Sequence, residues 1–162
     1  FPQETGFLEM ASVGDYNLED YDKVLDICHK VLEVAPRDSS KTLRAWSTMG
    51  DIYHQLGDDK KAYKAYDKAL KINPDYIYVL NNYAYYLSVE GKNLKKAYNM
   101  SKRTIEAEPD NATYLDTYGW IMYKLGDCQS ALFYLERAIE HSHEKVEKEI
   151  ATHYKKVKKA CK

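Results

Sequence analysis

The hydrophobic and polar positions between residues 46 and 74 predict two helices joined by a turn. Large residues in the first half, and alternating small and large residues in the second, recur at the spacing that places them on one helix face. Gly57 marks the turn between the halves, and Pro74 stops the second helix because proline cannot continue one. The two apolar stripes consist of Trp46, Met49, Gly50 and Tyr53, and then of Ala62, Tyr66 and Ala69.

The same helical hairpin recurs along the chain with a period of about 34 residues. The turn glycines are spaced 34 and 35 residues apart, at Gly57, Gly91 and Gly126. Small residues that allow two helices to approach closely follow the same spacing, at Gly50, Ala84 and Gly119. We therefore predict repeats at residues 43–76, 77–111 and 112–145. A single hairpin leaves apolar surface in water, so such units are expected to stack.

The flanking segments predict a weaker repeat before these three and a capping helix after them. Residues 5–38 contain a good second helix that ends at Pro36, whereas Gly14 interrupts the first helix expected around residues 7–16. Pro36 and Pro74 are 38 residues apart, so we expect a longer loop or an extra helical turn after Pro36, capped by Ser39 or Ser40. Residues 146–162 form one amphipathic, lysine-rich helix that is expected to cap the last hairpin. The whole chain, 1–162, is then a single array of about four hairpins.

The composition is that of one soluble domain with an ample core. The net charge is −1 and aromatic residues make up 13% of the chain, including 16 tyrosines. No apolar run reaches the length needed to span a bilayer. The chain begins at Phe1, which we interpret as a fragment or a processed product. The three cysteines are widely spaced and form no CxxC pair, so we expect neither a disulfide framework nor a zinc site, and interpret Cys28 and Cys128 as small helix residues.

The sequence contains no arrangement that favours catalysis or cofactor binding. His141 and His143 are two residues apart and do not share a helix face, so they make a poor metal site. Cys28 and His29 are adjacent, and their side chains diverge on a helix. No glycine-rich phosphate loop is present. We predict a protein that is not an enzyme and that has no catalytic residue, no metal and no cofactor.

The repeat pattern resembles that of tetratricopeptide repeat (TPR) proteins. The resemblance is specific over residues 43–145 and looser over residues 5–38. Residues 80–88 and 111–120 are similar to segments of bacterial members, especially those of the Bacteroidetes type. The resemblance implies an all-α, right-handed solenoid of antiparallel hairpins. It also implies that the first helices line a concave groove that binds a peptide or a partner segment.

The resemblance places the groove on first-helix positions opposite the packing stripe. The positions implied to bind a partner are Arg44, Ser47, Asp51, Gln55, Tyr78, Asn81, Asn82, Tyr85, Thr113, Asp116, Trp120 and Tyr123. Amides can pair with both donors and acceptors of a peptide backbone, and aromatic rings supply rigid contact area. Some family members hold a partner's terminal carboxylate with a basic clamp. Here Asp51 and Ser47 replace clamp residues, so a neutral or basic segment fits better.

Charge is distributed unevenly and leaves a second function class open. Residues 1–42 carry nine acids and four bases, and residues 144–162 carry seven lysines and three acids. These faces are either ordinary solvated surfaces or the ends through which copies of the chain attract one another. The favoured hypothesis is a protein-binding scaffold, and the alternative is a self-assembly unit, a possible homo-oligomer. A net charge near zero argues against nucleic-acid binding. The compartment stays open; the members most resembled are often exported from the cytoplasm or membrane-anchored.

Overall fold

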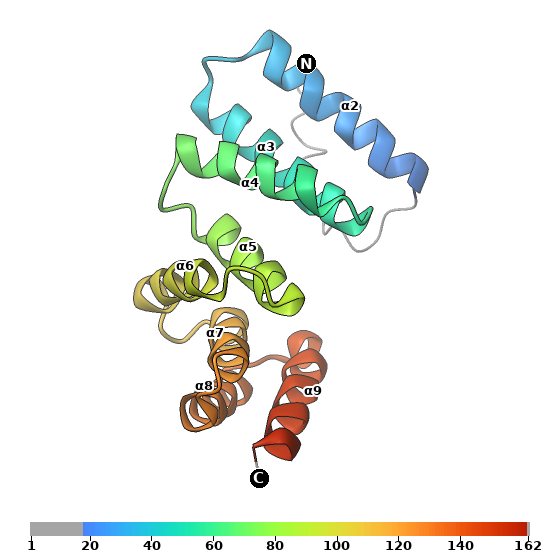
Figure 1. Cartoon of the computed structure of the whole chain (residues 1–162). Coiled ribbons are helices and arrows are strands. Elements are labelled where there is room, and N and C mark those ends of the chain that lie inside the picture. Colours follow the sequence, from blue (N-terminus) through green and yellow to red (C-terminus); the bar gives the residue numbers. More distant parts are fainter. Residues whose placement is uncertain (1–17, 162) are drawn as a thin grey trace. The chain divides into compact units, whose positions relative to one another are not determined.

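The computed structural model describes residues 18–161, and for residues 18, 19 and 144–147 it describes the backbone alone. All regular elements in this range are helices (Figure 1). They are α2 (Leu18–Val34), α3 (Ser39–Gln55), α4 (Asp59–Ile72), α5 (Ile77–Glu90), α6 (Leu94–Ala107), α7 (Ala112–Lys124), α8 (Cys128–Glu140) and α9 (Glu144–Ala160). The degenerate helix expected around residues 7–16 lies outside the described residues.

The chain divides into two compact units, and each is described by itself. The first unit covers residues 1–79 and contains α2, α3, α4 and the first residues of α5. The second unit covers residues 80–162 and contains the rest of α5 together with α6 to α9. In the first unit α3 packs against α2 and α4. In the second unit α7 packs against α6 and α8, and α9 packs against α8 and α7.

Glycines end the first helices because the turn requires a left-handed backbone. Gly57, Gly91 and Gly126 have φ values of +76°, +69° and +86°. After Gly57 and Gly126 an aspartate caps the next helix at once. The second hairpin has one residue more between its turn glycine and the next helix than the hairpin of Gly57, and Asn93 in this turn lies in the left-handed region at φ +42°. Asn93 makes no side-chain cap to α6.

Aspartates cap the N-termini of α3, α4 and α8. Asp38, Asp58 and Asp127 each accept a hydrogen bond from the backbone N–H three residues on, at 3.0 or 3.1 Å. The cap of α3 is therefore Asp38, and the prediction of Ser39 or Ser40 is wrong. Both serines follow the cap and lie inside the helix. The backbone bond from Lys41 is the main cause that lowers the pKa of Asp38. Such caps contribute stability above the ordinary carboxyl pKa, and the contribution is lost as the pH falls.

The two helices of a hairpin touch where the first helix lacks a side chain. A Cβ atom added to Gly50 would overlap the ring of Tyr66, which is fully buried in α4. A Cβ atom on Gly119 would lie 2.9 Å from Cγ of Leu135 and 3.1 Å from the carbonyl oxygen of Ala131. The predicted close approach is therefore present in both hairpins.

In the first unit, α2 supplies the apolar face that covers α3. Its residues Tyr21, Val24 and Cys28 are buried in one cluster with Met49 and Ile52 of α3. The spacing of these α2 residues is that of one helix face, as predicted for the second helix of an earlier hairpin. Cys28 is a free thiol, and burial raises its pKa to about 12.

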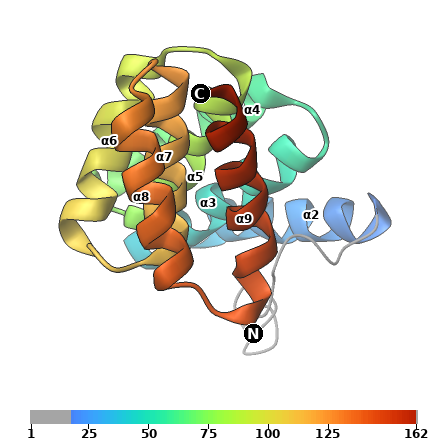
Figure 2. The same ribbon diagram turned by 90° about the horizontal axis from the view of Figure 1, so that it is seen from below.

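In the second unit, α9 lies alongside α8 and α7 (Figures 1 and 2). Ile150 and Val157 of α9 are fully buried, which agrees with the predicted apolar stripe. A disulfide joins Cys128 and Cys161, with their Cα atoms 5.7 Å apart. The interpretation of Cys128 as a plain helix residue is thus wrong. The antiparallel run of α8 and α9 brings the first residue of α8 beside the end of α9, 33 residues later in sequence.

We expect Gly119→Ala to lower the free energy of unfolding by up to about 2 kcal/mol. Overpacking against Leu135 costs about 1–3 kcal/mol, which outweighs the gain of about 1 kcal/mol from better helix propensity. Urea denaturation followed by circular dichroism measures the difference. Ala84 of α5 is the position equivalent to Gly119 in the second hairpin, and it is fully buried. That hairpin therefore accommodates a methyl group at this position. A stabilised Gly119→Ala variant would contradict the close approach.

Candidate interaction face

The twelve predicted binding positions lie on α3, α5 and α7, and in each unit we call them its first-helix face. They differ widely in exposure. Buried positions are Ser47, Asp51, Asn81, Asp116 and Trp120. Half-buried positions are Arg44, Asn82, Tyr85 and Tyr123, and exposed positions are Gln55, Tyr78 and Thr113. Only the last two groups present side-chain surface that a partner can reach directly.

In the first unit the face is organised around the buried carboxylate of Asp51. One carboxylate oxygen accepts from the hydroxyl of Tyr66 at 2.5 Å, and the other accepts from Tyr78 at 2.7 Å. The Tyr66 bond connects the face to the close-approach residue that packs on Gly50. Asp51 therefore helps fix the hairpin. Tyr78, which is 42% exposed, keeps part of its ring available on the same face.

Ser47 contributes to the helix itself rather than to an open surface. Its hydroxyl donates to the carbonyl oxygen of Leu43 at 2.7 Å, one turn earlier in α3. Gln55 lies at the end of the same helix and is exposed. The reachable part of the face in the first unit thus comes from Gln55, Tyr78 and the half-buried Arg44.

In the second unit the face on α7 is occupied by side chains of α9. Nδ1 of His153 lies 2.8 and 2.9 Å from the two carboxylate oxygens of Asp116. The imidazole also lies against the indole of Trp120, with ring centroids 4.6 Å apart and the planes tilted by 31°. Nζ of Lys156 lies 5.0 Å from the centre of the same indole, in range for a cation–π contact. A carboxylate and an indole thus hold one imidazole and one ammonium group.

Tyr85 of α5 completes this cluster. Its hydroxyl lies 3.4 Å from Nε2 of His153, and the two ring centroids are 5.9 Å apart. Burial raises the pKa of Tyr85, and the negative charges of Asp116 and Glu149 raise it further. The phenol is therefore held in its neutral form, able to donate or accept a hydrogen bond beside the imidazole.

Two buried polar atoms on this face have no hydrogen-bond partner within the described part of the chain. They are Oδ1 of Asn81, on α5, and Nε1 of Trp120, on α7. A buried donor or acceptor left unpaired costs free energy, and native structures seldom keep one without a function or a water. The pair offers an acceptor on α5 and a donor on α7, both in the second unit.

His153 and Lys156 contact this face and were not predicted from the sequence. The apolar stripe of residues 146–162 was predicted from the sequence, whereas the rest of the helix was expected to be a solvated surface. A signal was present in the helical spacing, because His153 is three residues from Ile150 and Lys156 is three residues from His153. Side chains at such spacings border the buried stripe and so reach the neighbouring helix.

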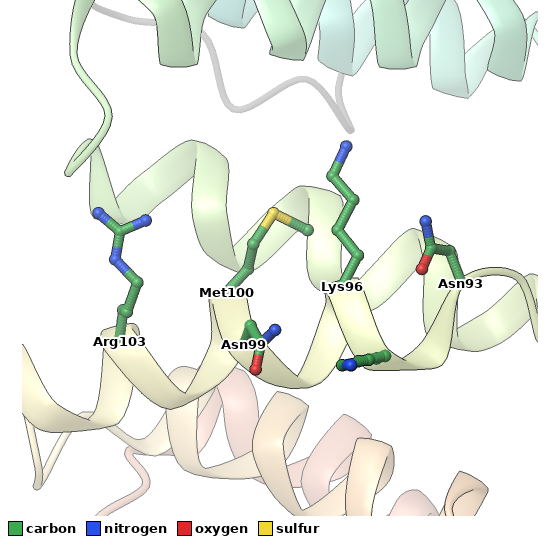
Figure 3. A pocket seen from close by; sticks show the side chains of 6 residues that line it. Asn93, Lys96, Asn99, Met100 and Arg103 are labelled. Carbon is green, nitrogen blue, oxygen red and sulfur yellow. The ribbon is translucent and has the colours of Figure 1, made fainter.

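A separate hollow lies on α6, away from the predicted positions (Figure 3). Asn93, Lys95, Lys96, Asn99, Met100 and Arg103 line it. Lys96 donates to the hydroxyl of Tyr83 at 2.8 Å and sits over that ring, 4.1 Å from its centre. Two lysines and an arginine give the hollow a cationic rim.

Among the described residues, none of the helices combines the length and the apolar composition needed to cross a bilayer.

Solved structures share this fold. A structure titled for PilF of Pseudomonas aeruginosa covers 96% of the chain with a TM-score of 0.71 and 18% identity, and the chain covers 64% of it. PilW, titled as a type IV pilus biogenesis factor, matches 86% of the chain with a TM-score of 0.69 and 22% identity; 60% of that structure is covered. A MamA mutant structure matches 86% of the chain with a TM-score of 0.67 and 18% identity, and 84% of it is covered. The chain thus spans less than two thirds of PilF and PilW.

One curated relative is similar over a shorter segment. The uncharacterized protein ycf37 of Pyropia yezoensis is 35% identical over 68 residues, which is 42% of this chain and 38% of that protein.

The family comparison covers more of the sequence. Residues 32–148 match the family described as the cytochrome c-type biogenesis protein H TPR domain. The prediction of an all-α TPR protein is thereby confirmed, while the Bacteroidetes-type affinity stays a prediction. Because the match extends over well more than half of its residues, the chain belongs to the family of cytochrome c-type biogenesis protein H TPR domains.

Proposed function

We propose that the chain is a non-enzymatic protein-interaction scaffold whose first-helix face binds a peptide or a segment of a partner protein. The observation that carries the proposal is the contact between α7 and α9. Asp116 and Trp120 hold two side chains of a helical segment by a charge-assisted hydrogen bond and by ring contacts. The face thus has the chemistry of a binding surface for polypeptide.

The exposed and half-buried positions add the other features that peptide recognition requires. Tyr78 and Tyr123 supply aromatic area with a polar end, and Gln55 supplies an amide that both donates and accepts. The acids of the face, Asp51 and Asp116, favour a neutral or basic segment over an acidic one.

The names of the related proteins support a role in assembly. The matched family is named for cytochrome c-type biogenesis, and PilW is titled a pilus biogenesis factor. Both names concern biogenesis, a process in which a scaffold that brings partners together can take part. For this chain, the acids of the first-helix face point to a partner with a neutral or basic segment.

A library of displayed peptides tests the proposal on the full chain. We expect Tyr78→Ala and Tyr123→Ala each to weaken binding of the selected peptides about tenfold, as for interface aromatics that carry about 1.4 kcal/mol. Phe133→Ala is the matched control, because Phe133 is an aromatic residue of the second helix α8 and is 55% exposed. Fluorescence anisotropy measures the affinities, and circular dichroism verifies folding. Equal losses for all three variants would contradict a first-helix site.

Light-scattering mass across a salt series tests the self-assembly alternative. We expect the mass to stay that of one chain at low and high salt, since binding through the face needs no second copy. Assembly through the charged ends would give a mass above one chain at low salt that falls as salt is added, because salt screens exposed charges. That outcome would replace the scaffold proposal with the alternative.

A further inference from the structure

We infer that α9 is a built-in occupant of the α7 face, latched by the Cys128–Cys161 disulfide, and that reduction of this disulfide opens the face to a basic helical segment of a partner. The inference rests on the proposed function and names both the partner class and the control of its site. The α7 face here means Asp116 and Trp120 of α7 together with Tyr85 of α5. These side chains contact α9 through His153 and Lys156.

Helix α9 is attached to α8 by two connections. Residues 141–143 connect its start to the end of α8, and the disulfide connects its end, through Cys161, to the first residue of α8. The helix is therefore tethered to α8 at both ends. Without the disulfide, only the short connection at residues 141–143 would keep α9 near the α7 face.

Helix α9 covers Trp120 and Asp116 of α7. Trp120 is only 6% exposed, and His153 and Lys156 of α9 both lie against its indole. Asp116 is buried as well, and His153 is hydrogen-bonded to its carboxylate. A partner segment that uses these two residues must take the place of α9. The helix that the disulfide holds in place is thus the same helix that covers the binding surface.

The side chains of α9 show which chemistry suits the α7 face. This helix combines two fully buried aliphatic residues, Ile150 and Val157, with an imidazole on the carboxylate and an ammonium group on the indole. Its described side chains also include Lys155, Lys158 and Lys159. A competing segment of the same chemistry is an amphipathic helix with a basic border. The acid of the α7 face selects against an acidic segment.

The latch opens by ordinary thiol–disulfide exchange. Cys128 and Cys161 are both half-buried rather than enclosed, so a dithiol can reach them. A thiolate of the dithiol attacks one sulfur and displaces the other cysteine as a thiolate, which takes up a proton. The second thiol of the reagent then resolves the mixed disulfide. The dithiol loses two electrons and two protons, and the chain gains two thiols.

Opening is expected to become more frequent when the second tether is cut. In the loop-closure picture a crosslink over some 15–30 residues disfavours the open form by about a hundredfold. The apparent affinity for a competing segment scales with the fraction of molecules whose face is open. Reduction should therefore raise that affinity by at least about tenfold.

The test uses the full chain and a labelled synthetic peptide with the sequence of residues 144–160. We expect fluorescence anisotropy to show at least about tenfold tighter binding after treatment with a small dithiol. Cys161→Ser is the matched variant: it should bind the peptide like the reduced chain and should not respond to the dithiol. Binding that is equal before and after reduction, or absent in both states, would overturn the inference.

Two controls make the result specific to the α7 face. A peptide in which His153→Ala and Lys156→Ala are combined should bind the reduced chain at least about tenfold more weakly, and equal binding would overturn the assigned contacts. Hydrogen exchange of α9 in the unliganded chain should speed up at least about tenfold on reduction. Unchanged exchange would overturn the latch.

The outcome separates this inference from the proposed function. Library peptides that depend on Tyr78 and Tyr123 test the scaffold role without reduction of the disulfide. If they bind as proposed while the α9 peptide does not respond to reduction, the latch fails and the scaffold stands. If only the α9 peptide binds, and only after reduction, control of the α7 face by the disulfide is supported. The proposed binding of peptides through Tyr78 is then contradicted.

Discussion

The close approach of two helices within each hairpin is the constraint on which the described structure depends. Gly50 and Gly119 leave no room for a side chain, so Tyr66 and Leu135 pack directly against the backbone of the preceding helix. This contact sets where the rest of the first helix lies. The bond from Tyr66 to Asp51 then passes the packing geometry on to the first-helix face. Fold and candidate site are therefore coupled through single side chains.

The sequence predicted the features that are local or periodic. Turn glycines must adopt positive φ, and small residues must recur where helices cross, so both follow from spacing alone. The apolar stripes of α2 and α9 were recognisable for the same reason. The one local error, the cap of α3 at Asp38, arose because aspartate and serine can both cap a helix and they are adjacent here.

The features that escaped prediction join residues far apart in sequence. The disulfide spans 33 residues, and the contacts of Asp116 with His153 span 37. Helical spacing tells which side chains share a face, but it does not tell which end of one helix lies beside which end of another. For the same reason the family resemblance could name Asp116 and Trp120 as groove positions without revealing that the chain fills them with its own last helix.

Whether the α7 face binds polypeptide can be measured on Trp120 itself. The chain has two tryptophans, and Trp46 in the first unit serves as the internal reference for the indole N–H signals in an NMR spectrum. When the peptide of residues 144–160 is added to the reduced chain, the Trp120 indole signal should shift while the Trp46 signal stays in place. Two unmoved signals at saturating peptide, or equal shifts of both, would contradict a binding face on α7.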